Sequence, residues 1–167
     1  MILLPIEGVL AQRSTSLKGQ PPTAEGKALY SLLINSGEPV VLVSAEREPQ
    51  VAQDWLALEG FLRFAEVYHR GADPGSYEQF KVATLRRALA TGHRVRFYVD
   101  SDPAVITQVS DIGVPALLVV VPGDAIGRRI SRDQQSYQPW DTLVDTIETR
   151  AQEKANLSVR QLDVQEA

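Results

Sequence analysis

The stretch Phe97-Tyr98-Val99-Asp100-Ser101-Asp102-Pro103 contains a complete transition from a strand to a helix. Its apolar half predicts a buried strand, which we place at residues 94–99. The two carboxylates that follow favour the positive end of a helix, and a proline is well tolerated in the first helical turn. The stretch therefore predicts a strand–helix unit with acidic residues at the carboxyl end of the strand.

The same alternation runs through most of the chain. Further strands are predicted at residues 3–6, 39–43, 64–68 and 116–121, and helices at residues 24–35, 49–58, 76–90, 103–112 and from Trp140 onward. Alternating strands and helices predict an α/β fold: a three-layer sandwich with a mainly parallel central sheet and no large cap. We expect a single domain over residues 1–150 and a loosely ordered tail over residues 151–167.

Apolar side chains at helical spacing predict which residues form the core. In the helix at residues 49–58, the buried stripe is expected to contain Val51, Trp55 and Leu58. Phe97, Leu117 and Trp140 are likewise assigned to the core or to helix packing, because aromatic and branched apolar side chains favour buried positions.

Composition excludes several kinds of protein. The chain has 167 residues, no cysteine, two histidines and a net charge of -4. Disulfide scaffolds, zinc ribbons and thiol nucleophiles are excluded. The apolar opening contains Glu7 and lacks basic residues, unlike a signal peptide, and the apolar run at residues 114–121 is too short to span a bilayer. We expect a cytoplasmic protein without membrane contact.

The charge balance also argues against a large nucleic-acid surface. Mild acidity disfavours non-specific binding to phosphate backbones. Local basic groups remain, and they are Arg86, Arg87, Arg94 and Arg96, and Arg128, Arg129 and Arg132.

Polar residues that end the predicted strands form the candidate site, because ligands of parallel sheets bind beyond the carboxyl ends of the strands. Glu7, Ser44, Asp100 and Asp102 end three strands, and Lys81 precedes Asp100 by one helix and one strand. Carboxylates suit Mg²⁺, while an amine and a hydroxyl suit phosphate. Each residue also has a structural alternative: the carboxylates and Ser44 could cap turns or helices, and Lys81 could be a solvated helix residue.

The order of these residues resembles the four-motif pattern of the haloacid dehalogenase (HAD) superfamily of phosphohydrolases over residues 2–124. The corresponding stretches are Leu3-Leu4-Pro5-Ile6-Glu7-Gly8-Val9-Leu10, Val40-Val41-Leu42-Val43-Ser44-Ala45, Lys81, and Phe97-Tyr98-Val99-Asp100-Ser101-Asp102. The last stretch and its continuation to Asp124 are similar to the phosphatase domain of phage-type polynucleotide kinase-phosphatases. A flavodoxin-like or receiver-type α/β domain is the alternative fold.

The resemblance implies a HAD-like, Rossmannoid fold and hydrolysis of phosphoric monoesters. It implies catalytic roles for Glu7, Ser44 and Lys81. It also implies a Mg²⁺ ion held by Asp100, Asp102 and the backbone carbonyl of Glu7. A phage-encoded protein located in the host cytoplasm or the virion would fit the same resemblance.

The first motif departs from the family pattern. Pro5 stands where the family has its nucleophilic Asp, so the covalent mechanism has no attacking oxygen. Glu7 replaces the Asp that acts as general acid and base, and Val9 replaces a Thr. The paired acids are also separated by Ser101. These departures weaken the implied Mg²⁺ site.

Three functions follow from the pattern. The first is a HAD-fold protein that has lost phosphohydrolase activity and acts as a binding or assembly module, with a protein partner or as a homo-oligomer. The second is a divergent Mg²⁺-dependent phosphatase of nucleotide or nucleic-acid phosphate ends, in which Glu7, Asp100 or Asp102 activates water. The third is a non-catalytic binder of nucleic-acid ends. We expect no cofactor, with Mg²⁺ needed only by the second.

Overall fold

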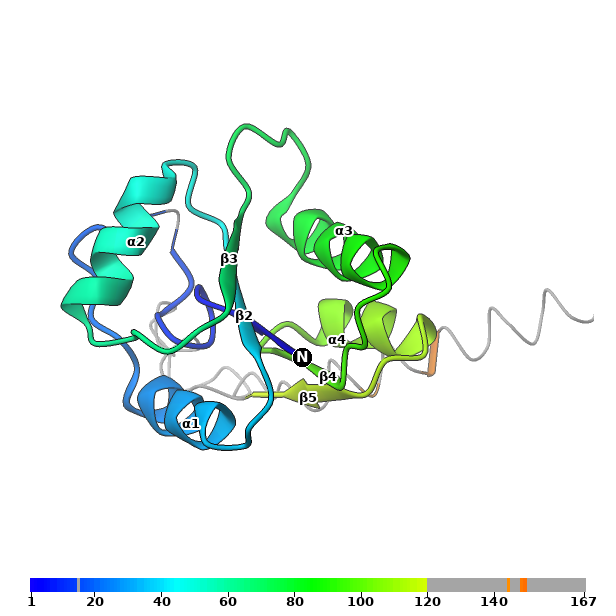
Figure 1. Cartoon of the computed structure of the whole chain (residues 1–167). Helices are drawn as coiled ribbons and strands as arrows, with labels where there is room; N and C mark the ends of the chain where they lie inside the picture. The colour runs from blue at the N-terminus through cyan, green and yellow to red at the C-terminus, as the bar shows by residue number, and fades with distance from the viewer. Residues whose placement is uncertain (15, 120–143, 145–147, 150–167) are drawn as a thin grey trace, which may run out of the picture.

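A five-stranded parallel sheet forms the centre of the computed structural model, which describes residues 1–14, 16–119, 144 and 148–149 (Figure 1). The strands are β1 (Ile2–Pro5), β2 (Val40–Ser44), β3 (Glu66–His69), β4 (Phe97–Asp100) and β5 (Ala116–Leu118). Their order across the sheet is β3-β2-β1-β4-β5, and each neighbouring pair is parallel. The two strands that carry the candidate site at their ends, β1 and β4, are therefore adjacent.

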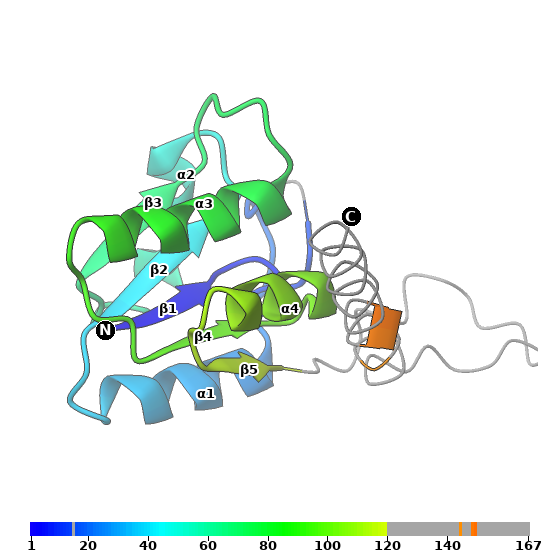
Figure 2. The ribbon, with the colours of Figure 1, turned by 90° about the vertical axis from the view of Figure 1, so that its right-hand side faces the viewer.

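In the described part of the chain, four helices cover the two faces of the sheet. They are α1 (Ala24–Ile34), α2 (Pro49–Leu58), α3 (Tyr77–Ala90) and α4 (Pro103–Asp111). Helices α1 and α2 lie on one face, and α3 and α4 lie on the other (Figures 1 and 2). The predicted α/β three-layer sandwich with a parallel sheet is confirmed.

Strand β1 is buried on both faces, which explains its continuous apolar sequence. Ile2 and Leu4 pack with α1 and α2, whereas Leu3 packs with α3 and α4, as the two-residue period of a strand requires. The same alternation directs Pro5 toward the face covered by α3 and α4.

Pro5 has no amide hydrogen, and β1 tolerates it because β1 no longer pairs with β4 at this residue. The amides of Ile2 and Ile6 donate toward β2, to the carbonyls of Pro39 and Val43 at 2.8 Å. The nitrogen of Pro5 therefore faces β4, where the β1–β4 register ends at Leu3 and Tyr98. A proline in a central strand costs little where the ladder has already ended.

Element ends differ slightly from the predictions. The strand predicted at residues 94–99 occupies Phe97–Asp100, and the one predicted at residues 64–68 occupies Glu66–His69. Strand β5 covers Ala116–Leu118, and residues 120–121 of that prediction lie outside the described residues. Of the helix predicted from Trp140, the structure describes only residues 144 and 148–149, which are helical. The arginines at 128, 129 and 132 and the tail at 151–167 lie outside the described residues. The single-domain boundary at residue 150 stays a prediction.

Two core assignments were wrong. Leu58 is 82% exposed, because the buried stripe of α2 is Ala52, Trp55 and Leu56, and residue 58 points away from it. Leu117 is 47% exposed, because β5 lies at the end of the sheet and pairs only with β4 among the described strands. Trp55 is buried as predicted.

No helix in the described part of the chain is both long enough and apolar enough to cross a membrane.

Candidate functional site

The loop after β1 turns sharply at Glu7 and Gly8. The carbonyl of Ile6 accepts hydrogen bonds from the amides of Leu10 and Ala11, at 2.8 and 2.9 Å. Gly8 has a φ of 91°, and a Cβ atom there would lie 2.5 Å from the Oγ of Ser101. The loops after β1 and β4 thus meet at one place, and a residue with a side chain would not fit between them.

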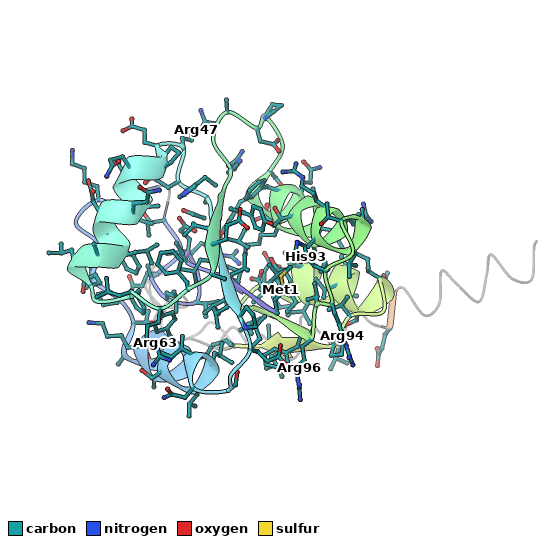
Figure 3. All side chains as sticks on the ribbon, viewed as in Figure 1. Met1, Arg47, Arg63, His93, Arg94 and Arg96 are labelled. Carbon is teal, nitrogen blue, oxygen red and sulfur yellow. The ribbon has the colours of Figure 1, made fainter. Side chains whose placement is uncertain are left out.

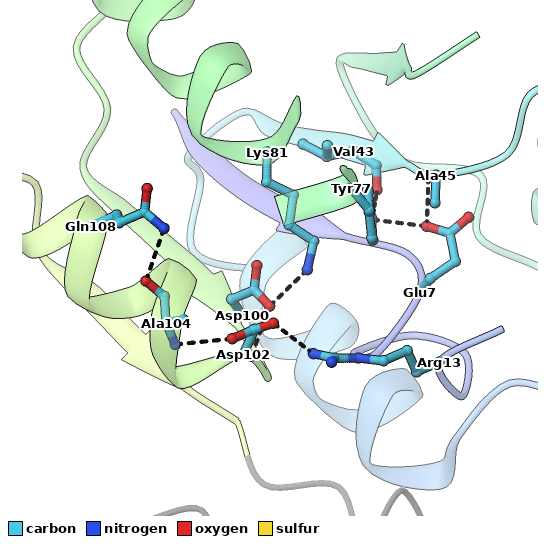
Figure 4. A network of polar contacts seen from close by, with 10 residues as sticks. All are labelled: Glu7, Arg13, Val43, Ala45, Tyr77, Lys81, Asp100, Asp102, Ala104 and Gln108. Carbon is cyan, nitrogen blue, oxygen red and sulfur yellow. Dashed lines mark hydrogen bonds and ion pairs between the residues drawn. The ribbon is translucent and has the colours of Figure 1, made fainter. Parts of the chain in front are cut away.

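Glu7 is 2% exposed, and three donors bind its carboxylate, of which Figure 4 shows Ala45 and Tyr77. The Ser44 hydroxyl donates to Oε1 at 2.9 Å, and the Ala45 amide donates to Oε2 at 2.9 Å. The Tyr77 hydroxyl lies 2.9 Å from Oε2 and 3.1 Å from the carbonyl oxygen of Val43. Both carboxylate oxygens of Glu7 are therefore occupied by groups of this chain.

Burial shifts the pKa values of two members of this site, Glu7 and Tyr77. Burial raises the pKa of the Glu7 carboxyl above its ordinary value, although the hydrogen bonds from Ala45, Tyr77 and Ser44 oppose the rise. Burial, together with the charges of Glu7 and Asp100, also raises the pKa of Tyr77 well above its ordinary value. Tyr77 thus keeps its proton and serves as a donor.

Lys81 and Asp100 form the second part of the site. Lys81 Nζ lies 2.9 Å from Asp100 Oδ1, and the same oxygen accepts the Asp102 amide at 2.9 Å. Asp100 Oδ2 is buried and has no hydrogen-bond partner among the described residues. Burial raises the pKa of the Asp100 carboxyl, and the Lys81 charge opposes that rise.

Asp102 begins helix α4 and is tied to the first loop. Its Oδ1 caps the helix by accepting the Ala104 amide at 2.9 Å, and its Oδ2 pairs with Arg13 Nη2 at 3.0 Å. The helix-cap alternative considered for Asp102 is thus correct as a description of its contacts. Arg13 is half-exposed, so the ion pair lies at the rim of the site.

The structure brings all five predicted residues to one edge of the sheet: Glu7, Ser44, Lys81, Asp100 and Asp102. The sequence reasoning missed Tyr77 and Arg13. Tyr77 precedes Lys81 by four residues, so it lies on the same face of α3, and Lys81 Nζ is 4.3 Å from the centre of its ring. The four-residue spacing of Tyr77 and Lys81 was the feature of the sequence that could have predicted this contact.

The arginines near β4 do not join the site. The amide of Arg96 donates to the carbonyl of Met1, and the carbonyl of Arg94 accepts from the Met1 ammonium group. Both therefore lie at the amino ends of the strands, beside Met1 (Figure 3). They are at the opposite edge of the sheet from Glu7 and Asp100.

The donor set does not fit a Mg²⁺ ion as it stands. Within residues 1–14 and 16–119, no group of three or more acidic or histidine side chains is placed to hold a metal ion. Lys81 occupies one oxygen of Asp100, and Arg13 and a helix amide occupy the oxygens of Asp102. Mg²⁺ requires several oxygen ligands in near-octahedral geometry, and of these four carboxylate oxygens only Asp100 Oδ2 is left without a partner among the described residues.

Comparisons with known proteins show the fold. No family model and no curated protein matches the chain. A chain in each of two structures of the Pnkp1/Rnl/Hen1 complex, one described as an RNA repair complex, matches 71% of this chain with a TM-score of 0.61 and 14% identity. The match covers 41% and 45% of those chains, so this chain spans less than half of their length.

A third structure is less similar. The D,D-heptose 1.7-bisphosphate phosphatase from B. bronchiseptica, complexed with magnesium and phosphate, has a TM-score of 0.49 and 15% identity. The match covers 70% of this chain and 78% of that one.

Proposed function

We propose that this protein is a HAD-like fold that has lost covalent phosphoryl transfer and acts as a binding or assembly module. Pro5 carries the proposal. It ends β1 on the face of the sheet that also carries Lys81 and Asp100, where the family resemblance places the nucleophilic Asp. A proline has no side-chain oxygen, so no aspartyl-phosphate can form there.

The remaining polar groups support the same proposal, because they pair with one another. The Ser44 hydroxyl donates to Glu7, and the Lys81 ammonium group binds Asp100. In a phosphatase of this pattern, the hydroxyl and the amine would bind phosphate. Here a substrate would have to take the single proton of the Ser44 hydroxyl from the buried Glu7 carboxylate before it could bind there, which is costly in a desolvated site.

Loss of Mg²⁺ binding is part of the proposal. The contacts of Lys81 and Arg13 place positive charge beside the two carboxylates that would ligate the ion. A divalent cation would find Asp100 Oδ2 without a partner among the described residues, but a second ligand from Asp102 would require displacement of Arg13 or the Ala104 amide. The second candidate function, a divergent Mg²⁺-dependent phosphatase, has the single unpartnered Asp100 Oδ2 in its favour, which is too few oxygen ligands to hold Mg²⁺ alone.

The binding role is supported by the surface of the α1 and α2 layer and by the likeness to a chain of a multi-protein complex. Leu32, Leu58 and Leu62 are 71%, 82% and 71% exposed. Large apolar side chains exposed together mark protein interaction surfaces, and we propose that these three, on α1, at the end of α2 and in the loop that follows, form part of one. The matched chains belong to an assembly of several proteins, so we assign the role to a different protein partner, in the cytoplasm.

A phosphatase assay tests the loss of activity. Purified protein, given Mg²⁺ and either an aryl phosphate or a 3′-phosphorylated oligonucleotide, should release no phosphate above a protein-free blank. Glu7→Ala tests the site, and Glu25→Ala, an exposed acid on α1, controls for contaminating phosphatase. Turnover that Glu7→Ala abolishes and Glu25→Ala preserves would refute the proposal.

A mass measurement tests the choice of partner. The isolated chain should elute at its monomer mass of 18.4 kDa in size-exclusion chromatography with light scattering. A dimer mass that returns to the monomer value in Leu58→Glu would replace the different partner with a second copy of the chain.

A further inference from the structure

Arginines are concentrated where α3 leads into β4. Arg86 and Arg87 lie in the last two turns of α3, and Arg94 and Arg96 lie just before β4. Residues 79–99 contain no acidic residue, although the whole chain has a net charge of -4. One short segment of an acidic protein therefore carries a local excess of positive charge.

The backbone directs two of these arginines to the same side. The segment pairs with Met1 in the manner of a parallel ladder, so it is extended. Val95 is buried, whereas Arg94 and Arg96 on either side of it are exposed. Side chains two residues apart in an extended chain point to one side and are about 6.6 Å apart. Arg94 and Arg96 therefore face solvent together at the amino edge of the sheet, beside His93 (Figure 3).

Most of this charge is not neutralised within the fold. In the described part of the chain, no acidic side chain forms an ion pair with Arg86, Arg87 or Arg94. Arg96 does bind Glu38, but its side chain is 66% exposed. Exposed guanidinium groups bind phosphate oxygens through paired hydrogen bonds, so this edge is suited to a partner with several phosphates.

Two rings lie among the arginines. His93 is exposed in the turn between α3 and β4. Tyr68 of β3 is half-buried: burial and the charge of Glu66 raise its pKa, and the charge of Arg87 opposes that rise, which places Arg87 near the ring. Bases of single-stranded nucleic acids stack on flat rings and on guanidinium planes. An acidic peptide would use the arginines but not the rings.

We propose that Arg86, Arg87, His93, Arg94 and Arg96 form a basic edge that binds the phosphate backbone of single-stranded nucleic acid. The basic edge lies at the opposite end of the strands from the candidate site. It is also separate from the surface of α1 and α2 that we assign to a protein partner. This goes beyond the proposed function and holds whether or not the chain hydrolyses phosphate.

Fluorescence anisotropy with a labelled oligonucleotide of about 16 nucleotides tests the proposal. The oligonucleotide should have no terminal phosphate, so that binding of an end at the candidate site is not measured. At about 50 mM salt, we expect the wild-type chain to bind with a dissociation constant of about 10–100 µM. The logarithm of the affinity should fall with the logarithm of the salt concentration with a slope of about -2 to -3, as for three or four phosphate contacts.

Charge reversal tests the location. Arg94→Glu and Arg86→Glu should each weaken binding about tenfold and make the salt slope smaller by about 0.7. Arg47→Glu is the matched control, because Arg47 is also exposed and the net charge changes equally, but Arg47 follows β2 at the carboxyl edge of the sheet (Figure 3). Its affinity should stay within about twofold of wild type. Unchanged melting temperatures show that the variants are folded.

Several results would overturn the proposal. No binding by the wild-type chain would do so, as would equal affinities for Arg94→Glu, Arg86→Glu and Arg47→Glu. A larger loss in Arg47→Glu than in the other two would place the nucleic acid at the carboxyl edge. A poly-glutamate peptide that binds as tightly as the oligonucleotide would replace nucleic acid with an acidic protein segment.

Discussion

Lys81 and Asp100 form an ion pair that is almost completely enclosed by the fold. Their side chains are 1% and 0% exposed, and Lys81 Nζ lies 2.9 Å from Asp100 Oδ1. The two residues come from α3 and β4 and are separated by 19 positions. A buried pair of this kind contributes less to net stability than its Coulomb attraction suggests, but removing one partner leaves an uncompensated charge.

The first prediction concerns this pair. Lys81→Met should lower the free energy of unfolding by about 3–5 kcal/mol, because Asp100 then stays buried without its counter-charge. Lys81→Met combined with Asp100→Asn removes both charges, keeps an oxygen for the Asp102 amide, and should regain more than half of that loss. Urea denaturation measures both values.

An exposed ion pair supplies the control for this prediction. Arg96 Nη1 and Glu38 Oε1 are also 2.9 Å apart, but their side chains are 66% and 29% exposed. Arg96→Met should hardly change stability, because solvent screens such a pair. Equal losses for Lys81→Met and Arg96→Met would contradict the role of burial.

The second prediction concerns pH. Burial raises the pKa of Glu7 in the folded chain above its ordinary value of 4.5, so the folded state holds the proton more tightly than the unfolded state. The stabilisation from protonated Glu7 is complete below the unfolded pKa and is lost as pH rises through the folded pKa. Glu7→Gln cannot ionise, so its stability relative to wild type should increase as pH rises from 4.5 toward neutrality.

Urea denaturation at a series of pH values measures this difference. The pKa of Asp100 is also raised, so Asp100 makes stability depend on pH in the same direction in both chains. Its contribution therefore cancels when the two chains are compared. A constant difference between wild type and Glu7→Gln over the whole range would mean that Glu7 has the same pKa in the folded and unfolded states.

The fold could be predicted from the sequence because it depends on local patterns. Continuous apolar runs mark strands that are buried on both faces, and capping residues such as Ser76 mark where helices begin. Leu58 and Leu117 were misassigned, because a hydrophobic residue does not show which neighbour covers it. Burial at a helix end or on the outermost strand depends on tertiary contacts.

The sequence predicted which residues reach the candidate site but not how they pair with one another. Topology placed Glu7, Ser44 and Asp100 at one edge of the sheet, because parallel strands end there together. Their pairing could not be read from the sequence. The contact of Lys81 Nζ with Asp100 Oδ1 at 2.9 Å depends on how α3 packs against β4, which the order of residues does not specify.

The third prediction concerns the contact between the loops after β1 and β4. Gly8→Ala should be more destabilising than Gly37→Ala, although both have a positive φ, of 91° and 80°. The strain of about 1–2 kcal/mol is common to both positions. Only at Gly8 would the new Cβ meet another atom, Ser101 Oγ at 2.5 Å, whereas nothing lies within 4 Å at Gly37.

A double variant isolates the contact. Ser101 Oγ is buried without a hydrogen-bond partner among the described residues, so Ser101→Ala should be neutral or slightly stabilising. In the Gly8→Ala background it should reduce the loss to that of Gly37→Ala. Thermal melting checks the order of the four variants, and a Gly8→Ala loss that Ser101→Ala leaves unchanged would exclude this contact as its cause.

The fourth prediction separates the Tyr77 hydroxyl from its ring. Tyr77→Phe keeps the ring beneath Lys81 but removes a donor to Glu7 Oε2, so unfolding should become easier by about 1.5–3 kcal/mol at neutral pH. Because that hydrogen bond holds down the pKa of Glu7, its loss should raise this pKa further. The fall in stability between acidic and neutral pH should therefore become larger in Tyr77→Phe.

Tyr30→Phe is the control. The Tyr30 hydroxyl accepts the Arg63 amide at 2.8 Å, far along the chain from Glu7, and its loss should lower stability without changing the pH dependence. Parallel pH profiles for the two variants would show that Tyr77 does not act through Glu7.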